Sequence, residues 1–203
     1  MIGIIDYGMG NLRSVQKALE SLGKDAVISS EKKVLNDCSG LILPGVGAFP
    51  DAMQNLRQNS LDEFILDYTK KGNMLLGICL GMQLLFKVGY EFHTCEGLGL
   101  LDGSIEKLTT NLKIPHMGWN NISICKDTPL LAGIRDGSYV YFVHSFYANM
   151  GNTEDLNAYA DYGQRVTAVV SRDNVYGTQF HPEKSGDVGI KMLSNFAEMI
   201  KKS

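Results

Sequence analysis

A cysteine flanked by glycines carries the most specific chemical signal in the sequence. The segment Gly77-Ile78-Cys79-Leu80-Gly81 follows the pattern G-x-S-x-G with cysteine in place of serine, which is typical of a nucleophile on a sharp strand-to-helix turn. That turn strains the backbone of the nucleophile and leaves no room for a Cβ on its neighbours, hence the glycines. The helix dipole favours the thiolate there. The alternative is a small buried residue in a turn, since unpaired cysteines are commonly buried.

A nucleophilic cysteine needs a base, and the base needs a group that orients it. Among the four histidines, only His181 lies at the end of a predicted strand with a carboxylate, Glu183, two residues later. In an extended chain, side chains two residues apart share a side, so Glu183 can hold the imidazole. Alone, this segment is more often a surface turn with a chance ion pair. Together with the cysteine turn, it favours a Cys–His–Glu triad.

Acyl transfer also needs backbone N–H groups that stabilise a negatively charged oxygen. The N–H of Leu80, directly after the nucleophile, is one predicted donor of this oxyanion hole. A second can come from the glycine-rich turn at 44–47, which follows a predicted strand and precedes a helix. The alternatives for this turn are a phosphate-binding loop or ordinary turn chemistry.

Length and charge limit the kind of protein that carries these residues. The 203 residues indicate a single domain, 1–203, and the net charge of −3 argues against a general electrostatic grip on nucleic acid or acidic lipid. We expect no targeting or membrane-spanning segment, and the four cysteines without a paired spacing indicate reduced thiols and a cytoplasmic protein. No metal-ligand spacing is present, so we expect no metal.

The pattern of apolar residues predicts the elements that position the chemistry. Buried strands are predicted at residues 2–5, 25–29, 41–43 and 74–78, with helices at 12–22, 48–58, 61–71 and 80–86. Shorter, more antiparallel strands are predicted at 122–125, 139–143, 158–162, 166–171 and 176–180, and a last helix at about 187–201. The prediction is an α/β fold whose mostly parallel central sheet is flanked by helices, with a smaller antiparallel portion in the C-terminal half.

Several blocks along the chain resemble a known family. PGVG at 44–47, GICLGMQ at 77–83 and FHPEKS at 180–185 are similar to the class I, or triad, glutamine amidotransferases. DYGMGN at 6–11, PHMGWN at 115–120 and YFVHSFYA at 141–148 narrow the resemblance to the glutaminase subunits of imidazole glycerol phosphate synthases. The resemblance implies hydrolysis of L-glutamine to glutamate and ammonia, without a cofactor. It also implies a heterodimer with a (βα)₈-barrel cyclase, which uses the ammonia to form imidazole glycerol phosphate and AICAR in histidine biosynthesis.

The family resemblance also implies roles for individual positions. In that family the oxyanion loop reorients when the substrate of the partner is bound. The implied positions are Cys79, His181 and Glu183 as the triad; Val46, Gly47 and Leu80 at the oxyanion hole; Gln83, Glu91, Ser145 and Phe146 around glutamine; and Asn11, Trp119, Tyr141 and Lys184 toward the cyclase. Without the resemblance, Gln83 and Glu91 could equally belong to an exposed helix face, and Trp119 could be a core residue.

The chain departs from the family pattern in two places, which keeps alternatives open. Ala48 follows PGVG, and Gly89 and Tyr90 stand where an acidic pair is expected before Glu91; no role is assigned to His93. One alternative is a paralogous glutaminase that supplies ammonia to a cyclase-like partner for amidino groups on sugars. The others are a non-catalytic scaffold for the partner and a cysteine hydrolase, such as a peptidase or a thioesterase, with a broader acyl pocket.

Overall fold

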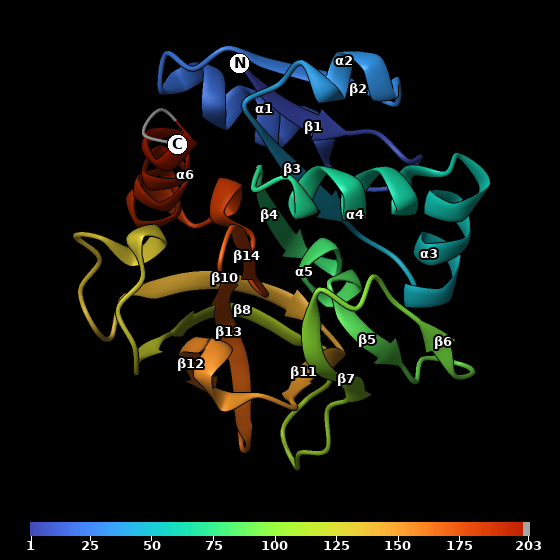
Figure 1. Ribbon diagram of the computed structural model, residues 1–203. Helices are drawn as coiled ribbons and strands as arrows, with labels where there is room; N and C mark the ends of the chain where they lie inside the picture. Colours follow the sequence, from blue (N-terminus) through green and yellow to red (C-terminus); the bar gives the residue numbers. More distant parts are fainter. Residues whose placement is uncertain (201–203) are drawn as a thin grey trace.

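Continuous apolar runs become the buried strands of a central sheet. The computed structural model describes residues 1–200 (Figure 1), in which every residue of β1 (Ile2–Ile5) and β3 (Gly40–Gly45) is buried, as is all of β4 (Met74–Cys79) after its first residue. The sheet runs in the order β2 (Ala26–Ser29), β1, β3, β4, β14 (Val175–Thr178), β13 (Arg165–Arg172), β12 (Leu156–Asp161) and β9 (Ser123–Ile124). The first five strands are parallel and the rest antiparallel.

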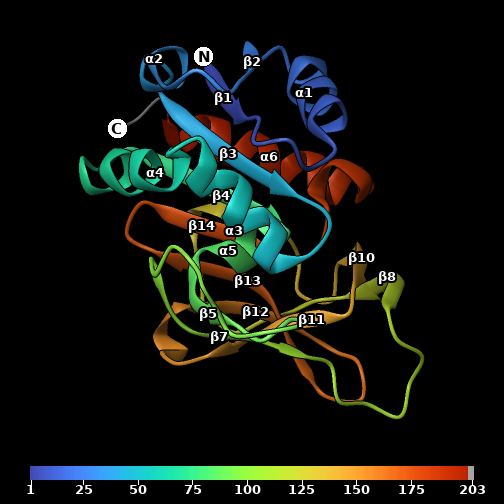
Figure 2. The ribbon, with the colours of Figure 1, turned by 90° about the vertical axis from the view of Figure 1, so that its right-hand side faces the viewer.

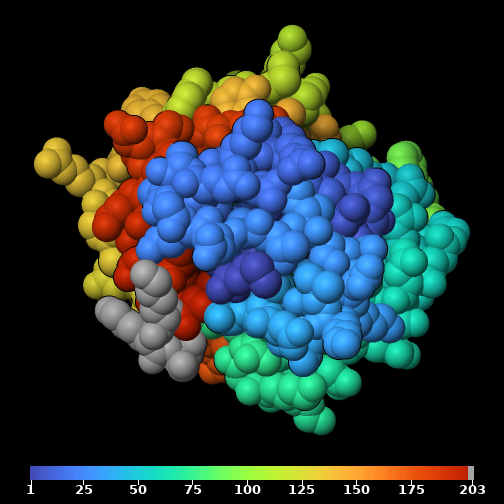
Figure 3. All heavy atoms as spheres, turned by 90° about the horizontal axis from the view of Figure 1, so that it is seen from above, coloured from blue at the N-terminus to red at the C-terminus, as the bar shows by residue number. Residues whose placement is uncertain are grey.

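Helices cover both faces of the parallel strands (Figure 2). On one face, α1 (Leu12–Ser21) and α6 (Gly186–Ile200) bury Leu19 and Phe196 against the sheet. On the other, α2 (Lys32–Asn36), α3 (Phe49–Gln58), α4 (Leu61–Lys70) and α5 (Leu80–Leu84) form a second core around Phe49 and Tyr68. The N-terminal segment covers the end of the molecule that lies at the top of Figure 1, and α6 borders it there (Figure 3).

Two smaller sheets surround the carboxyl ends of the parallel strands. The antiparallel ribbon of β8 (His116–Asn121) and β10 (Tyr139–His144) forms one. The other has the order β11 (Phe146–Met150), β7 (Leu101–Lys107), β5 (Phe86–Gly89) and β6 (Cys95–Glu96). Short 3₁₀ turns, η1 (Pro129–Leu131), η2 (Thr153–Asp155) and η3 (Pro182–Lys184), complete the described elements.

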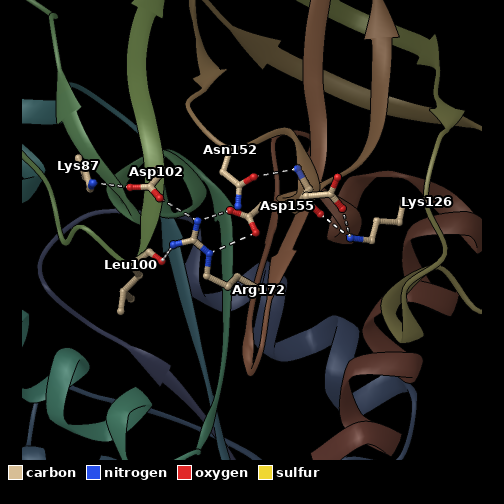
Figure 4. A network of polar contacts seen from close by, with 8 residues as sticks. Lys87, Leu100, Asp102, Lys126, Asn152, Asp155 and Arg172 are labelled. Atoms are coloured by element: carbon tan, nitrogen blue, oxygen red, sulfur yellow. Dashed lines mark hydrogen bonds and ion pairs between the residues drawn. The ribbon is translucent and has the colours of Figure 1, made fainter.

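An ionic cluster fastens the second of these sheets to the central one (Figure 4). Arg172 at the end of β13 donates to both carboxylate oxygens of Asp155, to Asp102 of β7 and to the Leu100 carbonyl, while Lys87 of β5 pairs with Asp102. Hydrogen bonds from Lys87 and Arg172 lower the pKa of the Asp102 carboxyl, and the bond to Asp155 raises that of Arg172. The cluster sets the position of β5 and β7 relative to β13.

The structure confirms the α/β fold with its mostly parallel sheet and corrects some elements. The helix predicted at 80–86 ends at Leu84, because Phe86 is buried as the first residue of β5. The strand predicted at 176–180 ends at Thr178, and it pairs in parallel with β4 as well as antiparallel with β13. Residue 201 of the last predicted helix lies outside the described residues.

Candidate active site

Cys79 lies on the strained turn between β4 and α5. Its φ and ψ are 55° and −111°, a conformation that costs a non-glycine residue of order 1–3 kcal/mol. A Cβ on Gly81 would lie 1.7 Å from the Leu43 carbonyl oxygen, and one on Gly77 would lie 2.7 Å from the backbone nitrogen of Met82. Both glycines are therefore required by the close approach of backbone, as the sequence pattern predicted.

His181 and Glu183 form a buried pair beside this turn. The Nδ1 atom of His181 lies 2.8 Å from Oε1 of Glu183, and their side chains are 2% and 1% exposed. Burial on its own lowers the pKa of His181, but interactions with the Cys79 sulfur and with Glu183 outweigh it and raise the pKa to about 10. The other ring nitrogen, Nε2, is buried without a hydrogen-bond partner in residues 1–200. These interactions favour the protonated imidazolium form of His181.

The loop that carries this pair is tied to the β8–β10 ribbon. The N–H of His181 donates to the Tyr141 carbonyl at 3.0 Å, and the hydroxyl of Ser185 donates to the His181 carbonyl at 2.6 Å. The N–H of Tyr141 in turn donates to the Ser185 hydroxyl at 3.0 Å. This closed set of bonds holds the ribbon and the His181 loop as one unit.

A cavity of about 280 Å³ opens next to the sulfur of Cys79, near the lower end of the size range for small-molecule sites. Its walls are Val46, Gly47, Cys79, Leu80, Gln83, Glu91, Val143, His144, Ser145 and Phe146. Eight of these residues, all except Val143 and His144, were predicted as site residues from the sequence. A larger hollow of about 400 Å³, around Met74, Tyr176 and Met199, contains neither a cysteine nor a histidine.

The glycine-rich turn forms the open side of this cavity. Val46 is 45% exposed, and Gly47 has a φ of 112°, in the region that favours glycine. Directly after the turn, the N–H of Phe49 at the start of α3 donates to Oε2 of Glu91 at 2.8 Å. Glu91, predicted to face glutamine, therefore lines the cavity and also caps α3.

Gln83 is buried rather than on an exposed helix face. Its Nε2 donates to the Phe146 carbonyl at 2.8 Å and to Oε1 of Gln179 at 3.0 Å. Gln179, which the sequence analysis missed, is completely buried and directs its own Nε2 to the Cys79 sulfur at 3.8 Å. It precedes His181 by two residues, the same spacing that pointed to Glu183.

Of the four residues predicted to face a partner, Trp119 and Tyr141 lie on the ribbon and Lys184 lies in the 3₁₀ turn after His181. Trp119 is 56% exposed, so the alternative of a core tryptophan is wrong, and its ring meets that of Tyr141 edge-on at 6.1 Å. Lys184 is exposed, whereas Asn11 is half-buried at the start of α1. His93 is exposed and does not line the cavity.

Within residues 1–200, no three His, Cys, Asp or Glu side chains come together as a metal site. No helix in the same range is both long and apolar enough to cross a membrane.

Comparisons with known proteins give one consistent result. The family model of glutamine amidotransferase class-I matches residues 3–200. The imidazole glycerol phosphate synthase subunit HisH of Caldanaerobacter subterraneus subsp. tengcongensis is 55% identical over 202 residues, 99% of each chain. The protein of the same name in Bacillus cereus is 50% identical over 200 residues, 98% of this chain and 95% of the relative.

Solved structures share the fold at lower identity. A crystal structure of a glutamine amidotransferase superposes with a TM-score of 0.77 at 20% identity, covering 98% of both chains. The structure of PurLQS from Thermotoga maritima gives a TM-score of 0.75 at 22% identity, covering 98% of this chain and 97% of the other. At these identities the similarity establishes the arrangement of helices and strands.

Proposed function

The chain belongs to the glutamine amidotransferase class-I family, and on that premise we propose that it is the glutaminase subunit of an imidazole glycerol phosphate synthase. In this proposal it hydrolyses L-glutamine and passes ammonia to a (βα)₈-barrel cyclase subunit, with which it forms a heterodimer. The family match over residues 3–200 supports a single amidotransferase domain, and the HisH relatives support the histidine pathway over the sugar-amidating alternative. The observation that carries the chemistry is Cys79 on its strained turn beside the buried His181–Glu183 pair.

We propose that Cys79 is the nucleophile. Its thiolate attacks the side-chain carbonyl carbon of glutamine, and the carbonyl oxygen becomes negatively charged. The imidazolium of His181 donates a proton to the departing nitrogen, and ammonia leaves as the thioester forms. A pKa of about 10 supports this role, because it keeps the ring protonated at neutral pH. Water then attacks the thioester while His181 accepts its proton, and glutamate leaves. Glu183 orients the ring throughout.

The charged oxygen needs donors that face it. The N–H of Leu80, at the start of α5, supplies one. The second comes from the N–H of Gly47 after the Val46–Gly47 peptide has turned, which the exposure of this loop and the flanking glycines allow at low steric cost. Gln83, Glu91, Ser145 and Phe146 surround the amino-acid part of glutamine. The exposed Trp119 and Lys184, together with the half-buried Tyr141 and Asn11, contact the cyclase.

Replacing the nucleophile tests this function. In the complex with the barrel cyclase, Cys79→Ala should abolish glutamine-dependent product formation and leave synthesis from added ammonium salt at the wild-type rate. Cys125→Ala is the matched control, because Cys125 is exposed and far along the chain from the turn. Loss of both reactions in Cys79→Ala alone would make Cys79 a structural residue and contradict the assignment.

The pathway is tested separately from the chemistry. A cyclase gene beside histidine genes supports the proposal, whereas a cyclase-like gene beside sugar-modifying genes supports the paralogue. The direct measurement is product formation from glutamine and the phosphoribosyl substrate of the histidine pathway by the purified pair. A pair that hydrolyses glutamine without forming imidazole glycerol phosphate would refute the pathway and leave the glutaminase intact.

A further inference from the structure

Two buried histidines that the proposed chemistry does not use lie behind the glutamine cavity. His144 is 6% exposed and lines the cavity, and His116, on the neighbouring strand of the ribbon, is 2% exposed. The ring of His116 is stacked between Phe142 and Tyr162, with centroid distances of 4.5 and 4.0 Å. Such enclosed imidazoles are costly unless each ring nitrogen has a partner.

The hydrogen bonds of the two rings allow one arrangement of protons. Nδ1 of His144 lies 2.8 Å from the Phe146 carbonyl, which only accepts, so Nδ1 carries the proton. Nε2 of His144 must then accept from Nδ1 of His116 at 3.0 Å. Nε2 of His116, left as an acceptor, lies 3.2 Å from the side-chain nitrogen of Asn120. Both rings are therefore neutral, and every nitrogen is used.

Burial supports the same protonation states. It lowers the pKa of His116 to about 4 and, with smaller contributions from His116 and His181, that of His144 to about 3. The folded-state pKa values lie below the ordinary value of about 6.5, so both rings stay neutral from pH 5 to 8.

This chain of bonds ends on a carbonyl that also holds Gln83. The oxygen of Phe146 accepts from His144 Nδ1 and from Gln83 Nε2, so both of its lone pairs are occupied. The second proton of Gln83 Nε2 goes to Gln179, which fixes the amide with its oxygen as the unused acceptor. A flipped amide would place oxygen against two acceptors. Among residues 1–200, no donor reaches Oε1 of Gln83, and this side chain lines the cavity.

We propose that His144, held by His116 and Asn120, is a positioning residue for glutamine: it fixes the Phe146 carbonyl and thereby directs Gln83 Oε1 toward the ammonium group of the substrate. This rests on the proposed function and deepens it. His144 touches none of the reacting atoms, so its loss affects binding more than the chemical step. The ribbon has its partner-facing residues on one face and these histidines on the other, because side chains alternate along a strand.

The kinetic test compares His144→Leu, His144→Asn and His93→Ala in the complex with the cyclase. His144→Leu should raise KM for glutamine about tenfold, the effect of about one lost hydrogen bond, with kcat changed less than about threefold. His144→Asn keeps an N–H near the position of Nδ1 and should recover most of the wild-type KM. His93→Ala, at an exposed histidine, should behave as wild type. Wild-type KM in His144→Leu, or a fall confined to kcat, would overturn the proposal.

A spectroscopic measurement on the unmodified chain covers the case in which His144→Leu fails to fold. Nitrogen-15 NMR of the imidazoles should show His116 and His144 as neutral rings protonated at Nδ1 and without titration from pH 5 to 8. Protonation of either ring at Nε2, or titration near pH 6.5, would refute the chain of hydrogen bonds from His116 through His144 to the Phe146 carbonyl. Failure of the proposed function looks different, because the wild-type complex would then not hydrolyse glutamine at all.

Discussion

Two parts of the cavity beside Cys79, the turn that carries Cys79 and the Val46–Gly47 loop, differ in how tightly they are held. In the Cys79 turn, a Cβ on Gly81 would lie 1.7 Å from the backbone oxygen of Leu43, an atom that cannot move aside. In the Val46–Gly47 loop, a Cβ on Gly47 would meet only the terminal methyl group of Met9, at 2.5 Å. Val46, beside it, is 45% exposed.

The turn with Cys79 carries the residues proposed for the reaction, and the Val46–Gly47 loop carries the part proposed to control it. The nucleophile and the His181–Glu183 pair are fixed by backbone packing and buried hydrogen bonds, so they are in place before any ligand arrives. In the proposed mechanism, the second oxyanion donor is the N–H of Gly47, on the exposed and less constrained Val46–Gly47 loop. We therefore expect a partner that activates the enzyme to act on this loop.

The largest expected effect comes from replacing a glycine with alanine in the Cys79 turn and, for comparison, in the Val46–Gly47 loop. Gly81→Ala should prevent cooperative folding, because a clash with backbone cannot be relieved. Gly47→Ala should fold, with a loss of about 1–3 kcal/mol from its left-handed φ, and lose activation by the partner. Thermal unfolding monitored by circular dichroism measures both. Equal melting temperatures for the two variants would contradict the contrast between the turn and the loop.

Removal of the proposed base, His181, tests the chemistry of the rigid Cys79 turn and the His181–Glu183 pair. His181→Ala should lower kcat by about 10⁴–10⁶, because members of a triad act as a unit. Glu183→Gln should cost about 10²–10⁴, since it mainly loses the orientation of the ring. Both rates are measured at saturating partner. Wild-type rates in both variants would exclude the triad.

The role of the exposed Val46–Gly47 loop can be tested without mutation. The isolated chain should hydrolyse glutamine slowly, and the partner carrying its own ligand should raise the rate by about 10²–10³, the effect of one oxyanion donor. The measurement compares the chain alone, with the cyclase, and with the cyclase plus its phosphoribosyl ligand. A lone chain that already reaches the rate of the full complex would be a stand-alone glutaminase with a preformed oxyanion hole.

The His181–Glu183 pair should also make the free energy of unfolding depend on pH. His181 has a folded-state pKa of about 10, above the ordinary value of about 6.5, so its stabilising effect is complete below pH 6.5 and disappears as the pH rises through 10. Glu183→Gln should flatten this decline, by about 1.4 kcal/mol for each unit by which the pKa falls. Urea unfolding at intervals from pH 6 to 10 gives the curves. Parallel curves would show that Glu183 does not stabilise the imidazolium.

The smallest effect is expected at the surface. Lys184→Ala should reduce activation by the partner several-fold, about 1 kcal/mol for an exposed charge, with basal hydrolysis unchanged. Lys191→Ala, a lysine on α6, is the control. The ratio of activated to basal rate measures the effect. An equal loss in the two rates would place Lys184 in the basal machinery instead.

The sequence was most informative where burial is uniform. Strands β1 to β4 are short apolar runs between helical patterns, so their positions and parallel direction could be predicted. β14, which also runs parallel to β4, was instead grouped with the antiparallel strands. By contrast, β8 reads His-Met-Gly-Trp-Asn-Asn, and its pattern is the reverse of the usual one: apolar Met117 and Trp119 face outward, and polar His116 and Asn120 face inward. A strand with this composition is identified only from its pairing with β10.

The site residues also fall into two groups, those predictable from the local sequence and those that depend on distant contacts. Cys79, His181 and Glu183 could be predicted, because a strained turn and a two-residue spacing leave marks in the local sequence. The contact of Gln83 with Gln179 joins residues 96 positions apart, and the His116–His144 bond joins residues 28 apart. Contacts of this kind depend on how elements far apart in the chain pack together, and no local pattern encodes that packing.

The exposed side chains of the ribbon have a consequence for how the cell must make this protein. Met117, Trp119 and Tyr139 are 60%, 56% and 60% exposed and share one face of two paired strands. Apolar strips of this kind promote self-association when nothing covers them. In the proposed heterodimer the cyclase covers this strip, so chains produced in excess of the cyclase would be the first to aggregate or to be degraded. Equal translation of the two subunits, as from adjacent genes on one messenger RNA, would keep the strip covered from the moment of folding.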